Sequence, residues 1–332
     1  MDSTQIDWKA LDRLRRAFLD GTAGAGDYWQ SDRDLASYDA TFAQRIGWKW
    51  DYVLGELRRR GWSPPKDVLL DWGCGSGIAS RAFLDHFGVE AVSSLALSDR
   101  SSLAVSYASR TAQEKYRSLD FSLGIPARPG TLLLSHVLTE LTPEQIDELV
   151  TVVETATTTI WVEPGTYEVS LALIAIRERL REHFNVVAPC THCAQCGILA
   201  SGNERHWCHH FASPPPGVFT DPQWSRFAHL TGIDLRRLPL SFLVLDRRTV
   251  PVVQQGATRV IGNPRIYKPY ALLLGCDAQG VRDRRVSKRQ LPEDFRRIKK
   301  GIAEPLQVWT CEGDEIISMK SLLPEIPGSP GG

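Results

Sequence analysis

The chain has 332 residues, of which 42% are hydrophobic, and it carries 39 basic and 39 acidic residues. This length predicts two domains, or one large domain with an appendage, and the apolar content suffices for a conventional core. No apolar run approaches the roughly 18–20 residues that a membrane helix requires. The charged N-terminal segment lacks the apolar stretch of a signal peptide. We therefore expect a cytoplasmic protein with no membrane partner.

The N-terminal region, residues 1–64, is predicted to be helical. Leu11, Leu14 and Phe18 recur at helical spacing, and later apolar residues up to Leu57 do the same. Glycine-rich residues 21–26 separate the two helical stretches.

Residues 65–250 show a different pattern, in which short apolar strands alternate with helices. The predicted strands lie at residues 68–72, 95–99, 131–135, 159–163, 185–188 and 241–245. Strands separated by helices predict an α/β fold with a doubly wound, Rossmann-like parallel sheet. The last two strands flank a cysteine-rich insertion, residues 189–212.

A glycine-rich turn follows the first predicted strand, with the pattern Asp71-x-Gly73-x-Gly75-x-Gly77. Glycine permits a positive φ and lets backbone amides approach a ligand closely. The spacing is not the G-x-G-x-x-G of dinucleotide-binding folds. It resembles the first motif of class I S-adenosylmethionine-dependent methyltransferases, and the alternative is a tight turn in another α/β enzyme.

The ends of the next two strands fit the same resemblance. Asp99 ends the second strand, where a carboxylate can accept hydrogen bonds from ribose hydroxyls. Ser135 ends the third strand, where the methionyl end of the cofactor would lie. The resemblance therefore implies S-adenosylmethionine as a cofactor. The expected cofactor-binding residues are Asp71, Gly73, Gly75, Gly77, Asp99 and Ser135.

Catalytic residues are not evident from the sequence. The segment from Ser135 to Glu140 lacks the Asn/Asp-Pro-Pro-aromatic signature of enzymes that methylate exocyclic base amines. His136 and Glu140 could hold or deprotonate a substrate. We favour the alternative that they are a strand-end histidine and a carboxylate at a helix N-terminus.

Four of the seven cysteines fall within nineteen residues, with the spacing Cys190-x2-Cys193-x2-Cys196-x11-Cys208, and Cys276 lies in a later apolar segment. In a cytosolic protein, clustered cysteines favour a metal site over disulfides. Three sites are compatible with the spacing. One is a zinc site completed by a histidine, His192, His209 or His210. Another is a ferredoxin-like cluster on the four local cysteines, and the third is a [4Fe–4S] cluster that recruits Cys276.

Residues 251–320 are predicted to form a small β-rich module with a basic helix near 292–301, followed by a disordered tail at 321–332. Between residues 257 and 300 there are twelve Lys or Arg residues against four Asp or Glu. Such a stretch favours a polyanionic partner, and nearby tyrosines can stack on bases. The alternative is a solvated basic helix. The candidate RNA-binding residues are Lys268, Arg282, Arg284, Arg285, Lys288, Arg289, Arg296 and Arg297.

Taken together, several segments resemble the methyltransferase-like proteins that act on the small ribosomal subunit in mitochondria and bacteria. These segments are residues 69–77, 161–177, 189–196, 207–209 and 241–247. The family resemblance implies a [4Fe–4S] cluster on Cys190, Cys196, Cys208 and Cys276. Cys193 departs from the family pattern, which has a polar residue there, and is therefore an alternative ligand.

The resemblance also implies a role with the small subunit and its 16S-type rRNA. Our leading hypothesis is a monomeric, cofactor-binding, iron–sulfur-containing factor that acts on this rRNA. The first alternative is a non-catalytic assembly factor that kept the methyltransferase fold. The second is a zinc-containing methyltransferase for tRNA or a small molecule.

Overall fold

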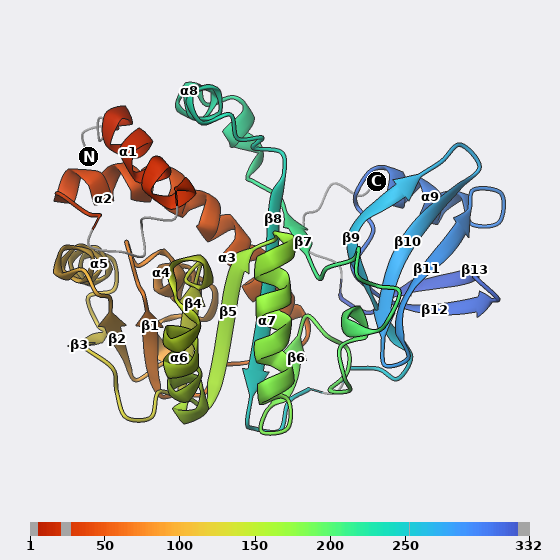
Figure 1. The fold of residues 1–332 in the computed structure, drawn as a ribbon, viewed down its shortest axis with the longest axis horizontal. Helices are drawn as coiled ribbons and strands as arrows, with labels where there is room; N and C mark the ends of the chain where they lie inside the picture. Colours follow the sequence, from red (N-terminus) through yellow and green to blue (C-terminus); the bar gives the residue numbers. More distant parts are fainter. Residues whose placement is uncertain (1–5, 21–27, 252, 325–332) are drawn as a thin grey trace.

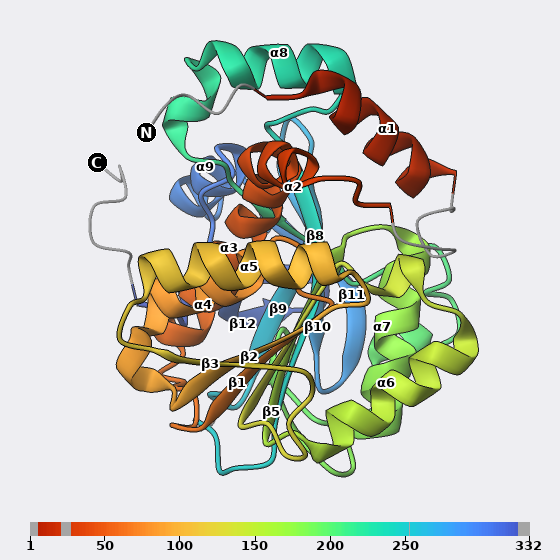
Figure 2. The ribbon, with the colours of Figure 1, turned by 90° about the vertical axis from the view of Figure 1, so that its left-hand side faces the viewer.

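The computed structural model describes residues 6–20, 28–251 and 253–324. An α/β domain and a β-barrel lie side by side, and the N-terminal helices α1 and α2 lie above one edge of the sheet (Figures 1 and 2). Among the described residues, no helix is long and apolar enough to cross a membrane.

The sheet of the α/β domain has the strand order β3-β2-β1-β4-β5-β8-β6, and β7 pairs with β8. Strands β1 to β5 run parallel, whereas β8 is antiparallel to both β5 and β6. This order is that of the class I methyltransferase fold, which confirms the predicted Rossmann-like sheet. The antiparallel β8 was not predicted, since strand direction leaves no trace in a short apolar run. The bounds are β1 Val68–Trp72, β2 Ser94–Ser98, β3 Asp120–Leu123, β4 Thr131–Ser135, β5 Thr158–Pro164, β6 Asn185–Ala188, β7 His210–Ala212 and β8 Leu238–Asp246.

Helices cover both faces of the sheet. Because successive strand residues point to opposite faces, Leu69 of β1 belongs to one apolar cluster with Phe83, and Leu70 belongs to the other with Leu173. The first layer contains α3, α4 and α5, and the second contains α6 and α7. The bounds are α1 Trp8–Leu19, α2 Asp32–Tyr38, α3 Gln44–Arg59, α4 Ile78–Phe87, α5 Ser102–Lys115, α6 Pro143–Thr155, α7 Tyr167–Leu180 and α8 Pro222–Thr231. A π-helical turn, Asp39–Ala43, joins α2 to α3.

The C-terminal module is a closed barrel with the strand order β10-β11-β13-β12-β9. Helix α9, Pro292–Lys299, lies between β11 and β12 along the chain. It inserts Phe295 and Ile298 into the barrel core. A Greek-key barrel with this order and this helix has the topology of an OB-fold. The strands are β9 Ala257–Ile266, β10 Tyr270–Asp277, β11 Gly280–Ser287, β12 Leu306–Glu312 and β13 Glu315–Ser321.

Two predicted features lie partly or wholly beyond the described residues. The glycine-rich separator at residues 21–26 lies outside them. The predicted tail begins at Ser321, which ends β13, and the next residues contact the barrel, where Leu323 is buried. Residues 325–332 lie outside the described part of the chain.

Candidate functional site

A cavity of about 690 Å³ lies at the carboxyl ends of the parallel strands. Ligands of open α/β sheets bind at this edge. Gly73 and Gly75 line it after β1, Asp99 after β2, and Ser135 and His136 after β4. The fold therefore brings most of the predicted cofactor residues to one cavity.

The glycine-rich turn is held in a conformation that other residues tolerate poorly. Gly73, Gly75 and Gly77 all have positive φ angles, 65°, 50° and 78°. A Cβ on Gly73 would lie 2.9 Å from Val137 Cγ1. The amide of Gly75 donates to Asp99 Oδ2 at 2.9 Å, so the carboxylate is tied to the turn.

Asp71 and Gly77 are not among the residues that line the cavity. Asp71 is fully buried, and its Oδ2 accepts from the Ser80 amide in the first turn of α4 at 3.1 Å. Burial raises the pKa of Asp71 to about 7. A Cβ on Gly77 would lie 3.0 Å from Ala108 Cβ. In this structure the two residues therefore shape the turn, and their direct contact with a cofactor stays a prediction.

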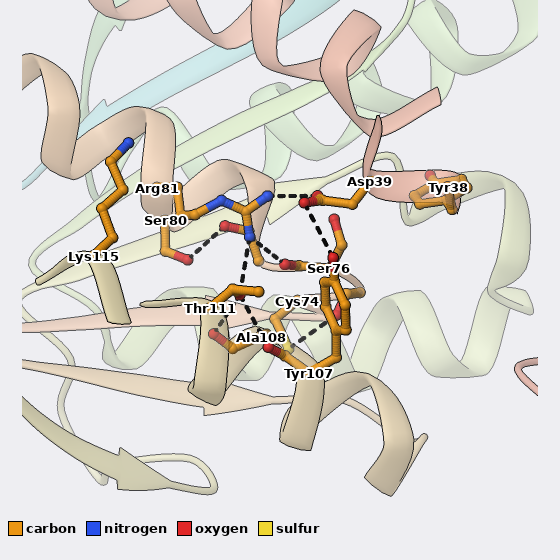
Figure 3. Close-up of polar contacts among 12 residues, drawn as sticks. Tyr38, Asp39, Cys74, Ser76, Ser80, Arg81, Tyr107, Ala108, Thr111 and Lys115 are labelled. Atoms are coloured by element: carbon orange, nitrogen blue, oxygen red, sulfur yellow. Dashed lines mark hydrogen bonds and ion pairs between the residues drawn. The ribbon is translucent and has the colours of Figure 1, made fainter. Parts of the chain in front are cut away.

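Arg81 connects the glycine-rich turn to the N-terminal helices (Figure 3). Its guanidinium donates to the Ser76 carbonyl at 2.5 Å and to Asp39 Oδ1 at 2.5 Å. It also reaches Thr111 Oγ1 of α5 at 3.3 Å. Because one side chain joins these three elements, the position of the turn depends on the N-terminal region.

His136 occupies a special position at the end of β4. It has a positive φ of 57°, and its Nε2 lies 3.3 Å from Lys49 Nζ of α3. Next to it, Ser135 Oγ accepts from Trp50 Nε1 at 2.9 Å. Burial lowers the pKa of Lys49 to about 7, and burial beside Lys49 and Arg45 lowers the pKa of His136 well below its usual value. Nothing in the sequence pattern indicated Lys49, because its partner lies 87 residues away.

Two glutamates lie close to the carboxyl ends of β4 and β5. Glu140, a predicted catalytic candidate, lines the cavity and pairs with Arg100 at 3.2 Å, and burial raises its pKa to about 7. Glu163 at the end of β5 is fully buried and accepts from the amides of Val137 and Leu138 and from Trp161 Nε1. Burial also raises the pKa of Glu163 to about 7.

An aromatic wall, formed by Phe18, Tyr28, Trp29 and Tyr38, lines the cavity from the N-terminal region. Neighbouring rings lie 4.8 to 5.1 Å apart from Phe18 through Tyr28 and Trp29 to Tyr38. The sequence pattern did not indicate these residues as part of a site. The only signal was the density of aromatic residues before the first strand, which is also typical of a helical core.

The cysteine-rich loop meets the barrel. Cys196, Cys208 and Cys276 belong to one apolar cluster, and the Cys190 thiol is close enough to affect the pKa of Cys208 and Cys276. Cys193 is exposed, and its Sγ accepts from the Val186 amide at 3.5 Å. The structure therefore groups the four predicted ligands and sets Cys193 apart.

The cysteine group offers donor atoms that bind metals, but its side chains do not have the geometry of a metal site in this structure. Among the described residues, no three His, Cys, Asp or Glu side chains form a metal-binding group. Burial raises the pKa of Cys196, Cys208 and Cys276, so these thiols are neutral without a cation. Both ring nitrogens of His192 are buried and have no hydrogen-bond partner in the described part of the chain. Four soft donors and an unpaired imidazole are compatible with either iron or zinc.

The predicted RNA-binding residues lie in four places on the barrel. Lys268, Arg285, Lys288 and Arg289 lie around the loop between β9 and β10 and the end of β11. Arg282 bonds to Gln279 in the β10–β11 turn, and Arg284 bonds to the Gly313 carbonyl in the β12–β13 turn. Arg296 and Arg297 lie on α9, where Arg296 pairs with Glu293. The predicted RNA-binding residues therefore lie on several elements of the barrel, and their contact with RNA stays a prediction.

The family of the chain follows from a comparison with family models. The model described as mitochondrial small ribosomal subunit Rsm22 matches residues 58–302. This chain belongs to the Rsm22 family. The match includes the glycine-rich turn, the cysteine-rich loop and most of the barrel, and it confirms the resemblance found in the sequence. A search of curated proteins found no match.

Solved structures give distant similarities. The plantazolicin methyltransferase BpumL in complex with SAH is 13% identical, with a TM-score of 0.38 over 72% of this chain and 100% of that one. A putative RNA methyltransferase, PH1948 from Pyrococcus horikoshii, is 13% identical, with a TM-score of 0.37 over 62% of this chain and 84% of that one. TrmK of M. capricolum, also solved with SAH, is 5% identical, with a TM-score of 0.32 over 60% of this chain and 69% of that one.

Proposed function

We propose that this Rsm22-family protein binds S-adenosylmethionine and methylates the rRNA of the small ribosomal subunit during assembly or translation. The observation that carries the proposal is the joint presence of Gly73, Gly75 and Asp99 in one cavity at the strand ends. The glycine backbone permits close approach of the cofactor, and Asp99 offers acceptors to ribose hydroxyls. The family match supports the small-subunit partner.

We further propose that Cys190, Cys196, Cys208 and Cys276 hold a [4Fe–4S] cluster. Support comes from their grouping and from the soft, buried character of the donors. Zinc is the alternative metal. The cluster would join the cysteine-rich loop to β10 of the barrel, so its role would be structural rather than electron transfer.

A non-catalytic assembly factor is the second candidate function. It is favoured because both catalytic candidates already have partners: His136 contacts Lys49 and Glu140 pairs with Arg100. The family model's description refers to the mitochondrial subunit, so the cytoplasmic location expected from the sequence remains a proposal, as does the monomeric state.

Calorimetry with S-adenosylmethionine tests cofactor binding. We expect Asp99→Ala to weaken binding at least about tenfold, because a hydrogen bond to a charged acceptor contributes about 1.5–3 kcal/mol. Leu123→Ala, at an exposed site on β3, is the matched control and should bind as the wild type. Equal affinity of wild type and Asp99→Ala would remove Asp99 from the site.

Methyl transfer is tested separately with radiolabelled cofactor and immature small subunits. Transfer of label to the rRNA supports methyltransferase activity. Loss of that transfer in Gly75→Val would show that the activity depends on the glycine-rich turn. Cofactor and subunit binding without transfer of label would favour the non-catalytic factor.

A further inference from the structure

The outward face of β10 carries Tyr270, Leu272, Leu274 and Cys276, because alternate strand residues point the same way. The intervening residues pack inside the barrel with Phe295 of α9. In OB-folds, the face of the second and third strands and the adjoining loops bind oligonucleotides. In this barrel those strands are β10 and β11.

One end of this face is closed by the α/β domain. Leu274 and Cys276 pack against Cys196 and Ile198 of the cysteine-rich loop. The approach is so close that a Cβ on Gly197 would lie 2.8 Å from Gly280 Cα. A nucleic acid strand therefore cannot follow the whole face of the barrel.

The other end of the face carries two tyrosines and an arginine. The rings of Tyr267 and Tyr270 lie 4.8 Å apart at an angle of 30°, and Tyr267 is 45% exposed. The Arg285 guanidinium lies over the Tyr270 ring, 4.5 Å from its centroid. Flat, partly exposed groups of this kind provide stacking surfaces for bases.

Two lysines lie on the chain segments next to these rings. The amide of Lys288 donates to the Pro269 carbonyl at 2.9 Å, which holds the end of β11 beside the β9–β10 loop. Lys268 and Lys288 are exposed, and neither forms an ion pair within the described residues. They are thus available to neutralise phosphates.

We propose that single-stranded RNA binds to this end of the barrel face by base stacking and phosphate contacts. The site is formed by Tyr267, Lys268, Tyr270, Arg285 and Lys288. The inference rests on the proposed function, since it names the form of rRNA that the barrel recognises. The closed Cys276 end limits the site to a short stretch, on the order of 4 nucleotides, the low end for an OB-fold. Duplex RNA does not present its base faces to such a surface.

Fluorescence anisotropy with a labelled uridine octamer tests the site, with an RNA hairpin of equal charge as the duplex probe. We expect the wild type to prefer the octamer. Tyr267→Ala and Tyr270→Ala should each weaken binding about tenfold, since stacking contributes about 1–3 kcal/mol per base. Tyr270→Phe, which keeps the ring, should bind as the wild type.

Charge and position are tested with a matched pair of double variants. Lys268→Ala with Lys288→Ala should reduce the slope of log affinity against log salt by roughly 1–2. Lys299→Ala with Lys300→Ala, which removes the same charge from the C-terminal end of α9, should bind the octamer as the wild type. Equal losses of octamer affinity in the two double variants would overturn the inference. It would also be overturned if the double variant Tyr267→Ala with Tyr270→Ala bound the octamer as tightly as the wild type.

Binding to purified small subunits distinguishes this inference from the proposed function. If the wild type binds subunits and a tyrosine variant binds the octamer with wild-type affinity, only the proposed single-stranded RNA site is overturned. A wild-type protein that binds neither subunits nor S-adenosylmethionine would overturn the proposed function itself.

Discussion

At the scale of single residues, several buried ionisable groups lie on the elements that line the cavity. Glu163, Asp71 and Lys49 are all buried, and burial shifts the pKa of each towards 7. Burial disfavours the charged form, so the carboxyl pKa values rise and the lysine pKa falls. Such shifts are frequent at functional sites, although structural groups can show them too.

Glu163 makes the stability of the protein depend on pH. Its folded-state pKa of about 7 lies above the usual 4.5, so the folded protein keeps this proton while the unfolded chain releases it. The stabilisation is complete below about pH 4.5 and is lost as the pH rises through 7. In Glu163→Gln, the free energy of unfolding relative to wild type should therefore rise by about 2–3 kcal/mol between pH 5 and pH 8.

Urea unfolding at the two pH values measures this difference. Glu154→Gln on the exposed face of α6 is the control for loss of a carboxylate outside the buried site. A constant difference for Glu163→Gln would show that this carboxyl titrates normally.

At the scale of elements, α3 connects three parts of the molecule. Its Trp50 bonds to Ser135 at the cavity, and its Glu56 forms two bonds to Arg259 of β9, at 2.6 and 2.8 Å. Just beyond its end, Arg60 pairs with Glu56 and donates to the carbonyls of the cysteine-rich loop, including Cys190. The helix therefore aligns the cavity, the loop and the barrel.

Removing the Glu56 carboxylate should destabilise the protein strongly. Glu56→Ala would leave two buried guanidinium groups, Arg259 and Arg60, without their partner. Loss of one member of a buried ion pair costs about 3–5 kcal/mol, which chemical denaturation can measure. The control is Asp147→Ala, which breaks the exposed pair with Arg179 and should cost at most about 1 kcal/mol. Similar losses in both variants would mean that α3 does not depend on this pair.

At the scale of the whole molecule, the cysteine group lies between the α/β domain and the barrel. If it holds a metal, Cys276→Ala should lose the metal and loosen the barrel, because β10 supplies that ligand. Iron and zinc content, visible absorbance and proteolysis between residues 247 and 256 measure these effects. Cys193→Ala and Cys311→Ala should keep both metal and protease resistance. If Cys193→Ala loses the metal and Cys276→Ala retains it, the metal site is instead formed by the four local cysteines of the cysteine-rich loop.

Local patterns predicted much of the fold. The strand at 68–72 and the turn that follows it could be recognised because hydrophobic runs and glycine spacing act over a few residues. The β-rich module was also recognised, but not its OB-fold topology. Its order depends on β9 pairing with both β10 and β12, which lies some forty residues further on.

The sequence by itself determined the family, the Rossmann-like domain and the residue types available for cofactor, metal and RNA. Only the tertiary structure decided which of them meet. It placed Lys49 against His136, grouped Cys276 with the cysteine-rich loop apart from Cys193, and distributed the basic residues over several elements of the barrel. The physical reason is that periodicity and spacing act between near neighbours, whereas these contacts depend on how distant elements pack.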